Sequence, residues 1–110
     1  MEIQSIKDGD IEVVYPIDRI DTVTAKDFEK FMNEAVDGNS KVVVSFSKIN
    51  YISSAGLRVF LVSAKKMKAK QGQLILCDLA PKIFEVFKMS GFDKILKIAP
   101  DLGQAKQQIN

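Results

Sequence analysis

The segment 49-INYISSAGLRVF-60 joins an apolar run to a helical pattern through two serines, an alanine and a glycine. From Leu57 onward, apolar residues recur every three or four positions, which predicts a helix that starts within about two residues of Ala55. Ser53 and Ser54 stand directly before this helix, where a hydroxyl commonly caps the first turn. The segment therefore predicts a capped turn that leads from the end of a buried apolar run into a helix.

The predicted helix changes character along its length. Leu57 and Leu61 lie on its apolar stripe and are expected to be buried. The run "KKMKAK" at residues 65–70 is expected to emerge into solvent, where positive charge suits a helix C-terminus. This basic run is interpreted either as a solvated helix face or as a phosphate-binding patch.

Upstream, the run "KVVVSFSKI" at residues 41–49 is β-branched with little alternation, which is typical of a central strand covered on both faces. A helix is predicted before it at residues 24–37, because apolar residues there fall at helical spacing. Thr22 or Thr24 is a candidate N-cap for that helix, and Asp27 occupies the capping-box position three residues after Thr24. Gly38 is expected to end this helix.

The remaining segments complete the pattern. Residues 1–18 predict a hairpin around "KDGD", with Pro16 at the end of its second strand. Downstream, we predict a buried strand at "QLILCDL", a helix from Pro81 to just before Gly91, and a strand near residues 94–98. A terminal helix capped by Asp101 closes the chain.

The predicted order β-β-α-β-α-β-α-β-α places the chain in the α/β class. We expect a small mixed sheet of four to five strands with about four helices, mostly packed on one side. Alternating strands and helices favour parallel pairing with right-handed crossovers. A length of 110 residues predicts a single domain, residues 1–110.

Composition excludes several classes of function. The chain has no histidine, which removes Ser-His-Asp and Cys-His catalysis and histidine metal sites. No glycine-rich phosphate loop occurs. Neither a cofactor nor a metal is expected. A net charge of +2 gives no reason to expect nucleic acid or membrane binding. The single cysteine, Cys77, lies in an apolar run and fits a reducing cytoplasm; no signal peptide or membrane span is expected.

Three roles compete for the two serines. A structural N-cap requires nothing beyond their position before the helix. A catalytic nucleophile is disfavoured, because "SSAGL" is not GxSxG and no histidine could activate a hydroxyl. A modification site is compatible with a cap, since a helix N-terminus tolerates a phosphate.

Three motifs carry a family resemblance. "INYISSAGLRVFL", "RIDTVTAKDF" and "APKIFEVFKMSGFDKIL" resemble, in order and spacing, the signatures of STAS domains, especially bacterial anti-sigma factor antagonists. The resemblance implies a STAS-like fold and a phosphorylated serine at Ser54. Ser53 stands where the family has an aspartate, and Ala55 replaces a second hydroxyl.

The resemblance also implies a role without catalysis. Such an antagonist binds an anti-sigma factor that is also a serine kinase, is released when phosphorylated, and is restored by a phosphatase. It implies a cytoplasmic monomer or weak dimer. We expect one contiguous partner-binding surface made by Asp21, Thr22, Thr24, Ser53, Ser54, Ala55, Gly56 and Arg58.

Two alternatives remain open. The chain could be a STAS module that docks without being phosphorylated, with Ser54 as a cap. It could also be a small nucleotide- or anion-binding protein that uses the helix N-termini at residues 22–24 and 54–57.

Overall fold

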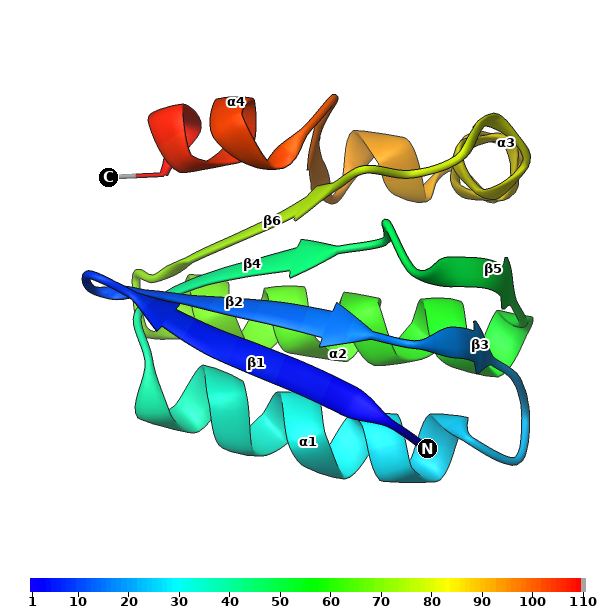
Figure 1. Cartoon of the computed structure of the whole chain (residues 1–110), viewed down its shortest axis with the longest axis horizontal. Coiled ribbons are helices and arrows are strands. Elements are labelled where there is room, and N and C mark those ends of the chain that lie inside the picture. Colours follow the sequence, from blue (N-terminus) through cyan, green and yellow to red (C-terminus); the bar gives the residue numbers. More distant parts are fainter. Residues whose placement is uncertain (110) are drawn as a thin grey trace.

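A computed structural model describes residues 1–109 (Figure 1). Its centre is a five-stranded sheet in the order β1-β2-β4-β6-β7, in which only the β1–β2 pair is antiparallel. These strands are β1 (Ile3–Asp8), β2 (Ile11–Pro16), β4 (Lys41–Ser45), β6 (Gln73–Cys77) and β7 (Lys97–Ala99). The expected mixed α/β sheet is confirmed, and so is the hairpin that ends at Pro16.

Four helices pack on the sheet: α1 (Ala25–Gly38), α2 (Ser54–Ala69), α3 (Pro81–Met89) and α4 (Leu102–Gln108). Residues of α1, α2 and α3 join the larger core together with Val42 and Val44 of β4. Val43 points to the other face, where α4 covers it in a second, smaller core (Figure 1). Helices therefore lie mostly on one side of the sheet, as the sequence predicts.

Four buried phenylalanines hold the larger core together. Phe60 of α2 lies at its centre, with ring centroids 5.2 Å from Phe28, 5.3 Å from Phe46 and 6.2 Å from Phe87. Three of these rings come from α1, α2 and α3, and Phe46 directly follows β4, so their contacts connect the helices to the sheet. Aromatic pairs at these spacings contribute about 0.5–1.5 kcal/mol each beyond area burial.

The predicted element order lacks two short strands that the structure contains. β3 (Asp18–Ile20) and β5 (Ile49–Ile52) pair in parallel as a separate two-stranded sheet. The expected strand at residues 41–49 accordingly ends at Ser45, and the chain turns before β5 begins. This second sheet extends the main one toward the start of α2 (Figure 1).

Several boundaries differ from the prediction. α1 runs from Ala25 to Gly38 rather than from 24 to 37, and Thr24 makes no side-chain cap hydrogen bond. The predicted strand at 94–98 begins with a 3₁₀ turn, η1 (Phe92–Lys94), and β7 follows only at Lys97. Asp101 does cap α4, by accepting from the Gln104 amide at 2.8 Å, while residue 110 lies outside the described residues.

The apolar stripe of α2 is buried as expected at Leu57, which is 6% exposed, whereas Leu61 is only half-buried. The basic end of the helix is mostly solvated, but Lys70 has a structural role. Its Nζ donates to the carbonyl oxygen of Val36 at 2.7 Å, at the C-terminal end of α1. No helix within residues 1–109 is long and apolar enough to cross a bilayer.

Candidate functional site

The N-terminus of α2 separates the two serines into different roles. Ser53 is the N-cap, and its Oγ accepts a hydrogen bond from the Gly56 amide at 3.2 Å. Ser54 is the first helical residue; it is exposed, and its hydroxyl makes no hydrogen bond within residues 1–109. A cap and an accessible hydroxyl therefore stand side by side, because only the first of the two serines is needed for the cap.

A turn at residues 21–24 forms the second part of the site. Asp21 Oδ1 accepts from the amides of Thr24 at 2.8 Å and Val23 at 3.0 Å, and Thr24 Oγ1 lies 3.1 Å away. These bonds, led by that from the Thr24 amide and helped by the nearby Arg19, hold the pKa of Asp21 below its ordinary value. Asp21 thus does what the sequence assigned to Thr24, because its carboxylate accepts the free amides before α1.

The pairing of β3 with β5 brings these two stretches together. Both strands end at the same edge, and the Ser53 amide donates to the Ile20 carbonyl oxygen at 2.8 Å. Arg19 adds a second link, since its guanidinium carbon lies 4.9 Å from the centroid of the Tyr51 ring. Residues 21–24 and the start of α2 are therefore neighbours in space at one end of the molecule (Figure 1).

The expected site residues differ in accessibility. Thr22, Ala55 and Arg58 line one hollow of about 280 Å³ between α1 and α2. Thr24 is half-buried and bonded to Asp21, and Gly56 is buried. The structure thus brings the predicted residues into one region, which we call the α2 entry surface. It is made by residues 21–24 and 53–58.

Other residues of the same hollow were not predicted from the sequence. Lys26 and Glu29 of α1 and Val59 and Val62 of α2 also line it. Their helical spacing was visible in the sequence, but the side-by-side packing of the two helices was not. The hollow combines charged groups with an apolar wall, a combination that is suited to contact with another protein.

The chain belongs to the STAS domain family, which matches residues 2–105. Over 81 residues it is 42% identical to BtrV of Bordetella bronchiseptica, which is classed as an anti-sigma factor antagonist; the match covers 73% of this chain and 70% of BtrV.

Solved structures share the fold. A Thermotoga maritima protein also classed as an anti-sigma factor antagonist superposes with a TM-score of 0.92 at 20% identity, over 97% of this chain and 93% of that one. The Bacillus cell fate determinant SpoIIAA in its phosphorylated form gives 0.73 at 16% identity, over 96% and 98%.

The division of roles between the serines predicts unequal costs of truncation. Ser53→Ala removes the cap of α2 and should lower the free energy of unfolding by about 1 kcal/mol. Ser54→Ala removes an exposed hydroxyl that makes no hydrogen bond within residues 1–109, and should change the free energy of unfolding by less than about 0.5 kcal/mol. Urea unfolding of both variants measures the difference; equal losses would contradict the assignment of the cap to Ser53.

Proposed function

We propose that this chain is an anti-sigma factor antagonist that acts by partner switching. Unmodified, it binds an anti-sigma factor with serine kinase activity through the α2 entry surface. Phosphorylation of Ser54 by that kinase releases the partner, and a phosphatase restores binding. In this role the chain is a binder and a substrate rather than an enzyme, and it works in the bacterial cytoplasm.

The observation that carries the proposal is the environment of the Ser54 hydroxyl. It is exposed and unbonded within the described residues, while Ser53 alone supplies the cap. A kinase can therefore reach Ser54 without unwinding α2, and its modification leaves the cap in place. A phosphate would also lie at the positive end of the helix dipole, where the fold tolerates it.

Release follows from the charge that phosphorylation adds. A phosphoserine carries about −1.5 to −2 charges at pH 7. Ser54 is part of the α2 entry surface, so a partner that covers this surface would take that charge out of water. Burying an ion without a compensating partner is costly, so the modified form is expected to bind weakly.

The relatives support the same role. BtrV is classed as an anti-sigma factor antagonist, and SpoIIAA, which has the same fold, has been solved in a phosphorylated form. Two of the three motifs that carry the resemblance contribute residues to the α2 entry surface.

The test uses purified anti-sigma factor kinases from the source bacterium. We expect one of them to bind the unmodified chain and, on addition of ATP, to phosphorylate Ser54 and dissociate. Ser54→Ala should remain bound in the presence of ATP. Ser54→Asp should fold and bind at least about tenfold more weakly, since one carboxylate imitates only part of a phosphate's charge.

Ser53→Ala is the matched control. It should still be phosphorylated, and mass spectrometry of the reaction identifies the modified residue. Phosphate on Ser53 alone would overturn the assignment of the switch. Stable binding with phosphate on neither serine would instead indicate a docking module.

A further inference from the structure

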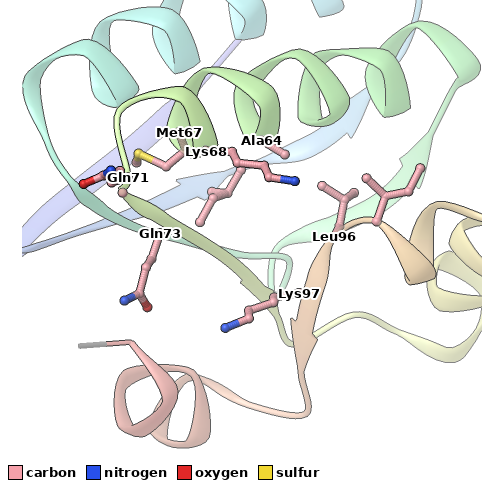
Figure 2. A pocket seen from close by; sticks show the side chains of 10 residues that line it. Ala64, Met67, Lys68, Gln71, Gln73, Leu96 and Lys97 are labelled. Atoms are coloured by element: carbon pink, nitrogen blue, oxygen red, sulfur yellow. The ribbon is translucent and has the colours of Figure 1, made fainter.

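A second hollow, of about 420 Å³, lies beside the C-terminal end of α2 (Figure 2). It is bounded by the last turns of α2, the start of β6 and the segment that leads into β7. A helix rises about 1.5 Å per residue, so Lys68 at this end is roughly 20 Å from Ser54. The hollow is therefore separate from the α2 entry surface.

Strand pairing explains why this space is open. β7 pairs only with Ile75–Cys77, so the first two residues of β6 have no strand neighbour on that side. The connection from α2 is tight at Gly72, where a Cβ would lie 2.5 Å from Met67 Sδ and 2.7 Å from the Ser40 carbonyl oxygen. The short β7 and the tight turn together leave a gap at the sheet edge.

Two lysine side chains flank the gap. Figure 2 shows Lys68 from α2 and Lys97 from β7 on opposite sides of it. Within residues 1–109, no carboxylate lies within 4.0 Å of either ammonium group, and no aspartate or glutamate lines the hollow. Nothing in the described structure neutralises this pair.

The surrounding sequence strengthens the positive charge. Residues 61–99 contain eight lysines and only three acidic residues, whereas residues 1–60 contain seven basic and ten acidic residues. The basic run at 65–70 belongs to the first of these segments. A concentration of one sign of charge around a concave surface attracts ligands of the opposite sign.

The inner wall of the hollow is apolar. Met67, Leu74 and Leu96 line it and are 1%, 9% and 5% exposed, while Ile95 lies at its rim and is 59% exposed. The lining also includes polar side chains, Gln71 and Gln73 together with the two lysines. Small-molecule sites typically combine apolar side chains with polar groups that fix the orientation of the ligand. The hollow thus offers an apolar contact and two ammonium groups to the same ligand.

We propose that this hollow binds a small organic phosphate, a phosphate monoester with a compact apolar body. Lys68 and Lys97 contact different oxygens of the dianion from opposite sides, and the apolar body lies against Met67, Leu74 and Leu96. Lysine is a common phosphate ligand because its ammonium is a compact charge with three donors. The inference does not depend on phosphorylation of Ser54.

Phenyl phosphate is the probe for the test, followed by amide chemical shifts of the full chain. We expect saturable shifts at residues 67–74 and 95–97, and weaker binding of inorganic phosphate, which lacks the apolar body. Lys68→Gln and Lys97→Gln should each weaken phenyl phosphate binding about five- to tenfold, the size expected for a lost charge-assisted hydrogen bond.

Lys82→Gln is the matched control, because Lys82 is an exposed lysine of α3 that does not line the hollow. It makes the same change in net charge and should alter the affinity less than twofold. If all three variants lowered the affinity for phenyl phosphate equally, net charge alone would explain the loss, and the proposal would be overturned. Shifts confined to residues 54–57, or binding only of an acidic peptide, would overturn it as well.

Discussion

The folded protein should react with Ellman's reagent at pH 8 at least about a thousandfold more slowly than the urea-unfolded chain. Cys77 is the only cysteine and is fully buried at the end of β6. Burial, with the neighbouring charge of Asp78, raises the pKa of its thiol from 9.0 to about 12. A pKa higher by three lowers the fraction of reactive thiolate about a thousandfold, before any loss of access is counted.

The dependence on denaturant provides the control for this prediction. If labelling requires unfolding, its rate should rise with urea in proportion to the unfolded population. A fast reaction that is independent of urea would show that β6 opens locally near Cys77.

The same thiol predicts a loss of stability in alkali. The unfolded chain gives up the thiol proton near pH 9, while the folded chain keeps it up to about pH 12. The unfolded state therefore binds fewer protons above pH 9, and the free energy of unfolding falls as pH rises from about 9 toward 12. Cys77→Ala should show a shallower alkaline decline in urea midpoint than the wild type.

Long apolar patterns made most of the fold predictable from the sequence. Residues 42–44 are three consecutive valines, and the residues of α2 keep one apolar stripe, so both elements were predicted with nearly the right starts. The strand was nevertheless predicted to continue to residue 49, four residues beyond its observed end. β3 and β5 have three and four residues, too few for a period to stand out. Each is stabilised mainly by pairing with the other, which a local pattern does not reveal.

The cap of α1 shows a similar limit within the candidate site. Asp21, Thr22 and Thr24 are all residue types that cap helices, and spacing alone favoured Thr24 because Asp27 follows it. In the structure the Thr24 hydroxyl bonds to Asp21, while Asp27 accepts from the N-terminal ammonium of Met1 at 3.2 Å. Which of these residues accepts the free amides before α1 depends on the position and direction of the chain at the end of β3, and these are set by tertiary structure.

The pairing of two lysines at the second hollow could not be predicted from the sequence. Lys68 and Lys97 are 29 residues apart and come together only through the parallel register in which Lys97 lies opposite Ile75. From the sequence, the basic run at residues 65–70 is interpreted either as a solvated helix face or as a phosphate-binding patch, and no pattern connects it with Lys97.

Gly56→Ala should lower the free energy of unfolding by about 1–3 kcal/mol, the usual cost of overpacking. An added Cβ would lie 2.7 Å from Ile20 Cγ2, 2.9 Å from Ile52 Cγ1 and 3.1 Å from the Ile20 carbonyl oxygen. That oxygen cannot move away freely, because it accepts the Ser53 amide at 2.8 Å. The methyl group would therefore push α2 away from β3 and β5.

Gly38→Ala is the matched control for the helix propensity of alanine. Gly38 ends α1, has no atom within 4 Å of an added Cβ, and does not have a left-handed backbone conformation. Its replacement should be neutral or stabilising by up to about 1 kcal/mol.

Opposite signs for the two substitutions in urea unfolding would assign the loss at Gly56 to the close approach of α2. The strain should also reach the α2 entry surface, because the Ser53–Ile20 hydrogen bond joins the start of α2 to the turn at residues 21–24. Amide shifts at residues 21–24 should therefore change in Gly56→Ala and stay constant in Gly38→Ala. If Gly56→Ala were as stable as Gly38→Ala, the close contact between α2 and β3 at Gly56 would be ruled out as the feature that positions the α2 entry surface.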